Sequence, residues 1–216
     1  MSNAENPATP MRPRTLVTGA SGFVGSHLVD VLVEEGTPVT ATSRHRPRYL
    51  DRPKYAPVRY VPSDLREPSS LRPAVEGQEL VFHSAALFDF FARQDELYTT
   101  NAVGTRNLLA ACRESGASRF VNISSGAIYG TSYENNLVKE TDRPYPTDKY
   151  SASKWAAEQE VFEAHGSGKL QAISLRPGAI YGPGSRYGDA KALYLMKRGF
   201  LFGKPGLKEV ISSHVH

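Results

Sequence analysis

The chain has 216 residues, of which 40% are hydrophobic and 22% charged, with a formal net charge of +4 and a single cysteine. These values are typical of a globular domain and exclude an internal disulfide, and no apolar run reaches the roughly 18 residues of a membrane span. Much of the positive charge lies in residues 44–54, where a local anion explains it better than nucleic acid, so we expect neither nucleic acid nor a membrane as a partner. Cys112 lies in an apolar helical pattern, and we predict that it packs in the core of a cytoplasmic protein.

The order of predicted elements indicates the fold class. Residues 1–13 are polar and contain three prolines, which predicts a disordered arm rather than a signal peptide. Apolar runs then predict strands at residues 14–18, 39–43, 58–61, 80–83, 120–124 and 170–175. Amphipathic stretches predict helices at residues 23–35, 95–115, 150–164 and 187–199. Strands that alternate with helices form right-handed βαβ units, so we expect an α/β protein with a doubly wound parallel sheet, a Rossmann fold of strand order 3-2-1-4-5-6.

A glycine-rich turn joins the first predicted strand to the first predicted helix. Gly19 can make the tight turn, Gly22 lets the backbone approach a pyrophosphate, and Gly25 lets the helix pack closely on the strand. The helix N-terminus then offers free N–H groups and a positive dipole end to phosphate. The spacing G-x-x-G-x-x-G also fits an ordinary tight turn, but its place between strand and helix favours dinucleotide binding. The residues expected to contact the cofactor here are Gly19, Ser21, Gly22, Phe23, Val24 and Gly25.

The end of the second predicted strand bears on the choice of cofactor. An acidic residue at this place would bind the ribose 2′-hydroxyl of NAD and repel the 2′-phosphate of NADP. This chain has Ser43 followed by Arg44, whose guanidinium can pair with a phosphate. We therefore predict NADP as the cofactor, with NAD as the alternative. The other arginines of this segment, Arg46 above all, fit a solvated loop equally well.

A Tyr-x-x-x-Lys pattern opens the helix predicted after the fifth strand. Tyr150 and Lys154 are four residues apart and so share one helix face. A nearby ammonium favours the phenolate, so we expect Lys154 to lower the pKa of Tyr150, which then exchanges a proton with a substrate oxygen. Ser125, just past the fifth strand, can donate a second hydrogen bond to that oxygen. These three residues form the predicted catalytic group, in which Lys154 can also hold the nicotinamide ribose.

These motifs together resemble the short-chain dehydrogenase/reductase superfamily, in the extended branch that includes epimerase/dehydratase and 3β-hydroxysteroid dehydrogenase-like proteins. The matching pieces run in family order at residues 18–25, 64–65, 83–86, 101–105, 124–125, 150–154 and 176–182. The resemblance implies an NAD(P)-dependent enzyme with Ser125, Tyr150 and Lys154 as its catalytic group. It also implies a mainly structural role for Asn101.

The same resemblance implies further cofactor contacts. Asp64 and Leu65 would flank the adenine, and Ala85 and Ala86 would line the cofactor path after the fourth strand. The segment that would border the nicotinamide is Pro177, Gly178, Ala179 and Ile180. Tyr150 and Lys154 would also contact the cofactor.

The resemblance divides the chain into three segments. After the arm of residues 1–13, residues 14–182 form the expected nucleotide-binding domain with its catalytic group. Residues 183–216 would begin a substrate-binding lobe, which is incomplete because members of this branch continue for about another hundred residues. The ending at residues 212–216 resembles the strand that leads into that lobe, so we expect the chain alone to bind cofactor but to turn over poorly.

Three functions remain open at this point. The first is hydride transfer between nicotinamide and a hydroxyl or keto carbon of a small substrate. The second is a nucleotide-sugar epimerase or dehydratase, which shares these motifs, and the third is a non-enzymatic NADP-binding sensor. Residues 87–91, with three aromatic side chains, are either local core or one wall of an apolar substrate pocket. No histidine has metal-ligand spacing, so no metal is expected, and a homodimer is left open.

Overall fold

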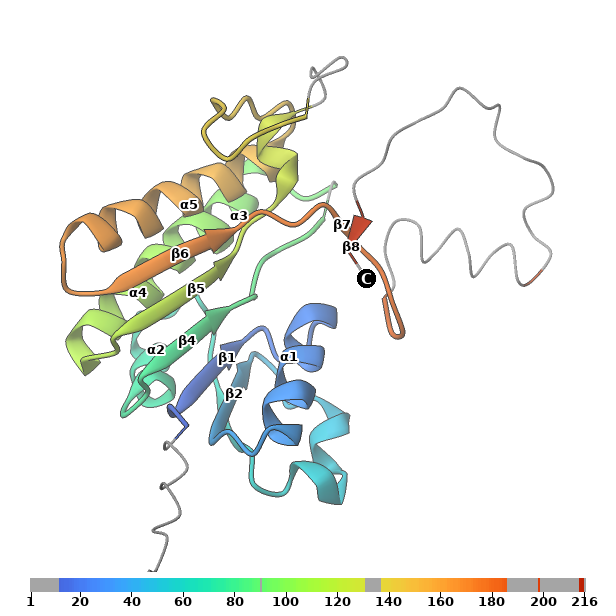
Figure 1. The fold of residues 1–216 in the computed structure, drawn as a ribbon, viewed down its shortest axis with the longest axis vertical. Coiled ribbons are helices and arrows are strands. Elements are labelled where there is room, and N and C mark those ends of the chain that lie inside the picture. Colours follow the sequence, from blue (N-terminus) through green and yellow to red (C-terminus); the bar gives the residue numbers. More distant parts are fainter. Residues whose placement is uncertain (1–11, 90, 131–136, 186–197, 199–213, 216) are drawn as a thin grey trace, which may run out of the picture.

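A parallel sheet of six strands forms the centre of the molecule (Figure 1). The computed structural model describes residues 12–89, 91–130, 137–185, 198 and 214–215. The strand order is β3-β2-β1-β4-β5-β6, and every neighbouring pair is parallel, which confirms the predicted order 3-2-1-4-5-6. The strands are β1 (Thr15–Thr18), β2 (Val39–Ser43), β3 (Arg59–Pro62), β4 (Leu80–His83), β5 (Arg119–Ile123) and β6 (Gln171–Leu175).

Helices cover the sheet from two sides (Figure 1). The helix α1 (Phe23–Glu34) packs on β1 and β2, whereas α2 (Pro68–Val75), α4 (Gly104–Ser115) and α5 (Lys149–Gly166) pack side by side on the other face. The shorter elements are η1 (Arg48–Asp51), η2 (Pro53–Tyr55), α3 (Gln94–Tyr98), the π-helical η3 (Thr99–Val103) and η4 (Gly126–Tyr129). A separate pair of short parallel strands, β7 (Ala179–Ile180) and β8 (His214–Val215), lies beyond β6.

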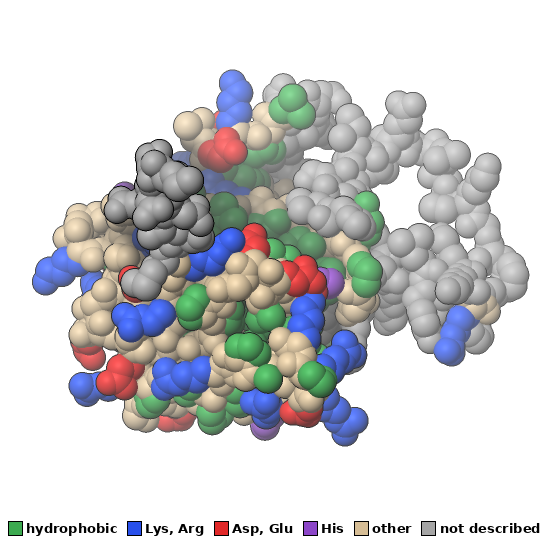
Figure 2. Space-filling model, turned by 60° about the horizontal axis from the view of Figure 1, so that its bottom comes forward, with side chains coloured by type: hydrophobic (Ala, Val, Ile, Leu, Met, Phe, Trp, Pro, Cys, Tyr) green, Lys and Arg blue, Asp and Glu red, His purple; other side chains and the backbone are tan. Residues whose placement is uncertain are grey.

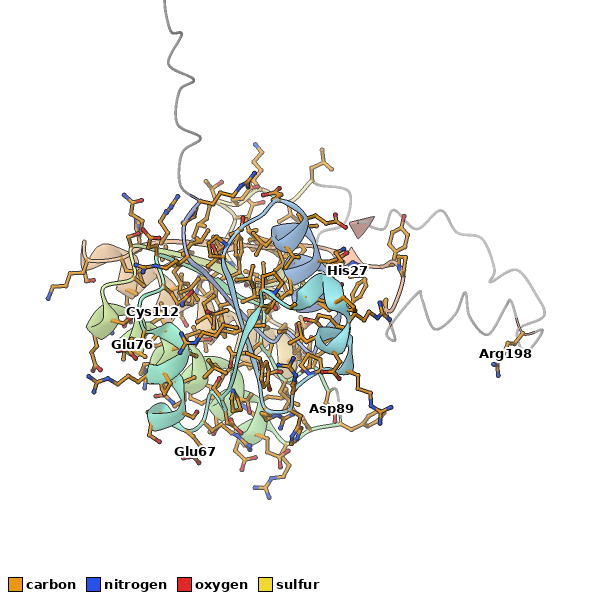
Figure 3. All side chains as sticks on the ribbon, turned by 90° about the horizontal axis from the view of Figure 1, so that it is seen from below. His27, Glu67, Glu76, Asp89, Cys112 and Arg198 are labelled. Carbon is orange, nitrogen blue, oxygen red and sulfur yellow. The ribbon has the colours of Figure 1, made fainter. Side chains whose placement is uncertain are left out.

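The side-chain alternation of β1 divides the core into two clusters. Leu16 points to the face covered by α2, α4 and α5, while its neighbour Val17 points to the face covered by α1. Both side chains are fully buried, as expected for the central strand of a sheet with helices on both faces. Cys112 is buried in the first cluster, which confirms its predicted place in the core, and burial raises the pKa of its thiol to about 12. Figure 3 shows Cys112 on the opposite side of the molecule from His27, which belongs to α1.

The structure differs from the predicted elements at two places, and a third prediction lies outside the described residues. The predicted helix of residues 95–115 is divided into α3, η3 and α4, with the π-helical stretch between the two α-helices. The helix α2 was not predicted, because Pro68 begins it and Pro73 interrupts its apolar pattern. The predicted helix of residues 187–199 falls outside the described residues except for position 198. No helix within the described ranges is long and apolar enough to cross a membrane.

A buried histidine links three elements at the carboxyl end of the sheet. The His83 Nδ1 atom lies 2.8 Å from the Thr18 hydroxyl at the end of β1, and its Nε2 atom lies 2.9 Å from the Thr105 hydroxyl on α4. Burial, and to a smaller extent the charge of Lys154, lowers the pKa of His83 from 6.5 to about 3. His83 is therefore neutral in the folded protein at neutral pH, and a neutral imidazole can make both hydrogen bonds because a hydroxyl group can donate or accept.

This shift makes the stability depend on pH. Between pH 6.5 and about 3 the unfolded chain binds a proton at His83 that the folded protein excludes, so stability is lost as the pH falls through this window. The slope from this one group is at most about 1.4 kcal/mol per pH unit. We expect urea denaturation to show this slope in the wild type and a smaller one in His83→Gln. Replacing the exposed His45 by Gln should leave the slope unchanged, and an equal slope in His83→Gln and the wild type would contradict the assignment.

Candidate active site

The glycine turn after β1 leaves no room for side chains. Gly19 has φ +69°, and a Cβ atom at this position would lie 2.7 Å from both the Cα and the N atoms of Ala85. A Cβ atom on Gly25 would lie 2.2 Å from the Gly19 carbonyl oxygen. Gly22 precedes α1, and no side chain caps the N-terminus of that helix. The first N–H groups of α1 are thus open to an anion, as the sequence predicts.

A cavity of about 260 Å³ lies next to this turn at the carboxyl ends of the strands. It brings together nine of the residues predicted to contact the cofactor: Gly19, Ser21, Gly22, Ser43, Arg44, Asp64, Leu65, Ala85 and Ala86. The remaining predicted contacts are not part of its lining: Phe23, Val24, Gly25, Tyr150, Lys154, Pro177, Gly178, Ala179 and Ile180. The cavity therefore contains half of the predicted cofactor contacts. Of the others, Phe23, Val24 and Gly25 lie in the first turn of α1 beside the glycine turn.

A tyrosine that the sequence analysis did not single out also supports the glycine turn. The Tyr49 hydroxyl of η1 donates a hydrogen bond of 2.9 Å to the Ala20 carbonyl. The Ala20 N–H donates to the Thr42 carbonyl of β2 at 3.1 Å. The turn is thereby fixed from the β2 side as well as by its close approach to β4. A tyrosine in a polar connection gives no periodic signal, which is why this contact could not be predicted.

Charged groups gather where β2 and β3 end. Arg44 is exposed, lines the cavity and makes no ion pair or side-chain hydrogen bond to any residue that the structure describes. Asp64 also lines the cavity, but Arg66 donates two side-chain hydrogen bonds to it, at 3.1 and 2.7 Å. Chiefly because of Arg66, the pKa of Asp64 is lowered to about 2. Ser43 is buried, and its hydroxyl donates to the His45 carbonyl at 2.8 Å.

The three predicted catalytic residues lie together between β5 and α5. Ser125 follows β5 and caps η4, since its hydroxyl accepts a hydrogen bond of 3.2 Å from the Ala127 N–H. Its side chain is also hydrogen-bonded to that of Tyr150, in the first turn of α5. Lys154, one turn further on, is buried and donates to the Ile123 carbonyl at 2.8 Å. The Gly126 N–H donates to the Pro177 carbonyl at 2.7 Å, so the segment predicted to border the nicotinamide adjoins this group.

The pKa of Tyr150 moves in the direction opposite to that expected from the sequence. Burial, and then the charge of Asp148, raises it to about 12, although the hydrogen bond to Ser125 opposes the rise. Burial lowers the pKa of Lys154 to about 8, against the effect of Glu158. The amine of Lys154 is directed to a backbone carbonyl of β5, and it is not among the groups that shift the pKa of Tyr150. In the protein alone, Tyr150 is therefore a protonated phenol at neutral pH.

Asn101 joins the loop after β4 to α5, the helix that carries Tyr150 and Lys154. Its Oδ1 accepts from the Leu87 N–H at 2.7 Å, and its Nδ2 donates to the Leu87 carbonyl at 3.0 Å and to the Ser153 hydroxyl at 2.9 Å. These three contacts hold the loop after β4 against α5. The π-helical turn η3 carries this side chain.

Two of the three aromatic side chains after β4, Phe88 and Phe91, are not part of the core. Phe88 is 36% exposed, and its ring meets that of Tyr150 edge to face with centroids 4.8 Å apart. Phe91 is 98% exposed, and position 90 falls outside the described residues. These exposures exclude the local-core alternative for Phe88 and Phe91. Phe88 thus presents an apolar surface beside the ring of Tyr150.

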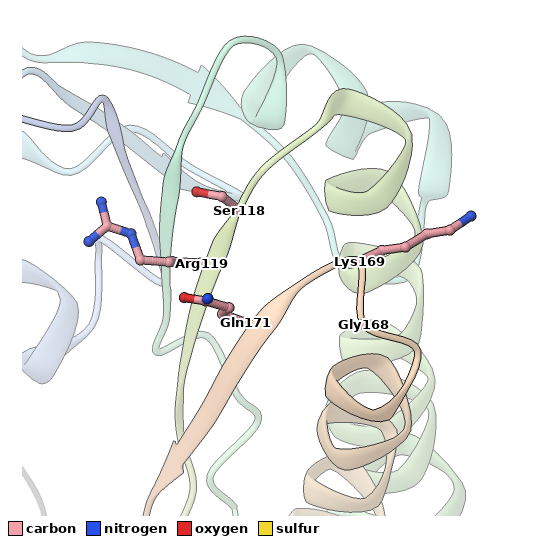
Figure 4. Close-up of a pocket in the computed structure, with 5 residues that line it drawn as sticks. All are labelled: Ser118, Arg119, Gly168, Lys169 and Gln171. Atoms are coloured by element: carbon pink, nitrogen blue, oxygen red, sulfur yellow. The ribbon is translucent and has the colours of Figure 1, made fainter.

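Two other surface features do not form a charged binding site. A second concavity lies at the amino ends of β5 and β6, where Arg119 and Lys169 point in opposite directions (Figure 4). On the face shown in Figure 2, Lys and Arg side chains are interspersed with Asp and Glu. No group of three His, Cys, Asp or Glu side chains in the described part of the chain is arranged to hold a metal ion.

Fold and site together define an α/β protein with a glycine-turn cavity and an adjoining Ser–Tyr–Lys group. The chain belongs to the NAD dependent epimerase/dehydratase family, whose model matches residues 15–208, and this confirms the resemblance inferred from the motifs. It is 34% identical over 178 residues to 2-alkyl-3-oxoalkanoate reductase of Stenotrophomonas maltophilia, covering 80% of this chain and 52% of that protein. It is 30% identical over 185 residues to 3beta-hydroxysteroid-dehydrogenase/decarboxylase isoform 1 of Arabidopsis thaliana, covering 79% of this chain and 42% of that protein.

A solved structure gives the same fold. The UDP-glucose 4-epimerase of Thermus thermophilus, in complex with NAD, matches with a TM-score of 0.78 and 30% identity over 94% of this chain and 70% of that one. The chain spans about half the length of the curated relatives named above.

Two glycines provide a matched test of the turn. Gly19 and Gly36 have nearly equal φ values, +69° and +72°, but a Cβ atom on Gly36 would meet no atom within 4 Å. Replacing either by Ala should cost about 1–2 kcal/mol of stability for the left-handed backbone. Gly19→Ala should cost a further 1–3 kcal/mol, roughly, because its methyl group collides with the backbone of Ala85. The measurement is the free energy of unfolding in urea, and equal losses in the two variants would contradict the close approach.

Proposed function

We propose that the protein to which this chain belongs is an NAD(P)-dependent oxidoreductase that transfers hydride between nicotinamide and a hydroxyl or keto carbon. The observation that carries the proposal is the hydrogen bond between Ser125 and Tyr150 at the carboxyl end of the sheet, with the buried Lys154 one helical turn away. Side chains of these types, placed beside a glycine-turn cavity, suit proton transfer coupled to hydride transfer.

The residues around the cavity fit a dinucleotide. A Cβ atom on Gly19 or Gly25 would collide with backbone, so these glycines let the turn pack closely against the loop after β4 and the start of α1, next to the place proposed for a pyrophosphate. The uncapped N-terminus of α1 supplies N–H donors to the same group. Ser43, Arg44, Asp64 and Leu65 would hold the adenosine end, and Ala85 with Ala86 the path between the two ends. Phe23, Val24 and Pro177–Ile180 would complete the site at the nicotinamide end.

The bound nicotinamide would supply or accept the hydride, and the protein would handle the proton. Tyr150 is protonated at neutral pH, so it is ready to donate a proton to the oxygen of a keto group during reduction. Ser125 can donate a second hydrogen bond to this oxygen once Tyr150 turns toward substrate. Lys154 would hold the nicotinamide ribose, and its ammonium would stabilise the phenolate that remains after proton transfer.

An apolar substrate suits this site best. Phe88 lies exposed against the ring of Tyr150, where the carbon skeleton of a keto or hydroxy compound would lie. The named reductase and hydroxysteroid dehydrogenase among the relatives support the same class. A small-molecule substrate, a cytoplasmic location and a homodimer stay predictions, as does the division of the chain into an arm, residues 14–182 and the beginning of a lobe.

A nucleotide-sugar epimerase or dehydratase is the second candidate. The family match and the similarity to UDP-glucose 4-epimerase favour it. The two candidates differ in what happens to the cofactor. An oxidoreductase leaves its cofactor oxidised or reduced at the end of a turnover, whereas an epimerase or dehydratase returns it to the starting oxidation state. The change in absorbance at the nicotinamide band, measured with ketones and with UDP- or dTDP-sugars, separates them. A non-enzymatic NADP sensor would show cofactor binding and no turnover of either substrate class.

The role of Tyr150 gives a direct test on the full-length protein. Tyr150→Phe removes the hydroxyl that exchanges the proton, so kcat for ketone reduction should fall by roughly 10²–10⁴-fold while the Kd for cofactor changes little. Tyr98→Phe, at an exposed tyrosine of α3, should retain full activity. Turnover by Tyr150→Phe at the wild-type rate would reject the proposed role.

The choice between NADP and NAD gives a second test. We propose NADP because Arg44 lines the cavity without an ion pair to any described residue, and because Arg66 already offsets the charge of Asp64. Arg44→Ala should weaken NADPH binding by roughly 10–100-fold, as for a lost charge-assisted hydrogen bond, and leave NADH binding unchanged. Arg52→Ala, at an exposed arginine of the same connection, should affect neither. Wild-type affinity that is equal for the two cofactors, or higher for NADH, would assign NAD instead.

A further inference from the structure

An almost fully buried ion pair lies behind the catalytic group. Glu158 of α5 is 0% exposed, and its Oε1 accepts hydrogen bonds from Nε of Arg176, at 2.8 Å, and from its Nη2. The side chain of Arg176 is 13% exposed, so this ion pair is the most buried one among the described residues. The second carboxylate oxygen of Glu158 is buried without a hydrogen-bond partner. A buried carboxylate is unfavourable unless its charge is compensated, so packing alone does not account for this residue.

Arg176 connects the catalytic helix to two other parts of the site. It immediately follows β6 and precedes Pro177, whose carbonyl accepts from the Gly126 N–H beside Ser125. Its Nη1 donates to the Tyr129 hydroxyl at the end of η4 and to the Glu140 carbonyl at 2.9 Å. The guanidinium carbon also lies 5.2 Å from the centre of the Tyr129 ring. One side chain thus ties together α5, η4 and the segment after β6.

Glu158 also lies one helical turn from Lys154, on the same face of α5. Lys154 is buried, with its amine on the Ile123 carbonyl. Burial lowers the pKa of Lys154 to about 8, and Glu158 is the charged group that opposes this change.

The other titratable or charged groups near Lys154 do not supply a negative charge to its ammonium. Tyr150 and His83 are neutral at pH 7, because burial raises the pKa of the first to about 12 and lowers that of the second to about 3. Arg176 carries the same charge as Lys154 and is paired with Glu158. Asp148, at the N-terminus of α5, acts on Tyr150.

We propose that Glu158 is a positioning residue of the active site. Its carboxylate supplies the counter-charge for the buried ammonium of Lys154, and through Arg176 it fixes the catalytic helix against η4 and the segment after β6. The effect on turnover rests on the proposed function, whereas the effect on Lys154 does not.

The experiment follows Lys154 directly in the full-length protein without cofactor. The protein is labelled with ¹³C-lysine, and the Cε resonance of Lys154 is assigned by its loss in Lys154→Met and followed by NMR as the pH is raised. We expect the midpoint of this titration to lie at least about one pH unit lower in Glu158→Gln than in the wild type, because an opposite charge is lost. Glu158→Asp should restore most of the difference.

Glu160→Gln is the matched control. Glu160 lies on the same helix and is also paired with an arginine, Arg106 of α4, at 2.9 Å, but this ion pair is less buried, with side-chain exposures of 15% for Glu160 and 54% for Arg106. This variant should leave the Lys154 midpoint unchanged. An unchanged midpoint in folded Glu158→Gln, or an equal change in Glu160→Gln, would overturn the proposal.

Two further variants and one assay complete the test. If Glu158→Gln does not fold because Arg176 is left buried and unpaired, the double variant Glu158→Gln/Arg176→Gln removes both charges and carries the same expectation. Failure of both to fold, with Glu158→Asp folded, would make Glu158 a residue of folding alone and also overturn the proposal.

In turnover assays Glu158→Gln should lower kcat by tenfold or more with little change in KM. A lower Lys154 midpoint in a protein that turns over no ketone would support the role of Glu158 and reject the proposed function instead.

Discussion

The close approach of two backbones, at Gly19 and Ala85, is the constraint on which the site depends. The turn after β1 passes so near the loop after β4 that a single methyl group would not fit between them. Because β1 and β4 are neighbours in a parallel sheet, their carboxyl ends lie at the same edge, and the turn and the loop meet there. The cavity next to the turn has one wall from each. Widening this contact would separate the glycine turn from the segment that leads through Leu87 and Asn101 to the catalytic helix.

Much of the fold and half of the site follow from local patterns in the sequence. The glycine turn could be predicted because its residues are contiguous and lie between a strand and a helix. Tyr150 and Lys154 could be predicted because a spacing of four residues places them on one helix face wherever the helix lies. The order of strands follows from the alternation of strands and helices and the handedness of their connections.

The rest depends on contacts between residues far apart in the chain. Glu158 and Arg176 are 18 residues apart, and neither belongs to a pattern that shows they meet in the interior. The pKa of Tyr150 was expected to be lowered, because the sequence shows that Lys154 is near but not that the phenol is buried. The direction of the Lys154 amine, toward the Ile123 carbonyl, likewise depends on how α5 packs on β5. The helix α2 was missed for a local reason, since its prolines disrupt the expected pattern.

The polar residues on the buried face of α5 affect how this helix aligns on the sheet during folding. Its buried positions include Ser151, Ser153, Lys154 and Glu158, and apolar side chains such as Val161 occupy only part of that face. Apolar contacts are non-directional and tolerate small displacements, but hydrogen bonds weaken steeply when their geometry is lost. A helix displaced along its axis by one residue would leave several polar groups in the interior without partners. The helix α5 is therefore selective for one alignment on the sheet, because a misplaced α5 would lose its polar contacts at Lys154 and Glu158.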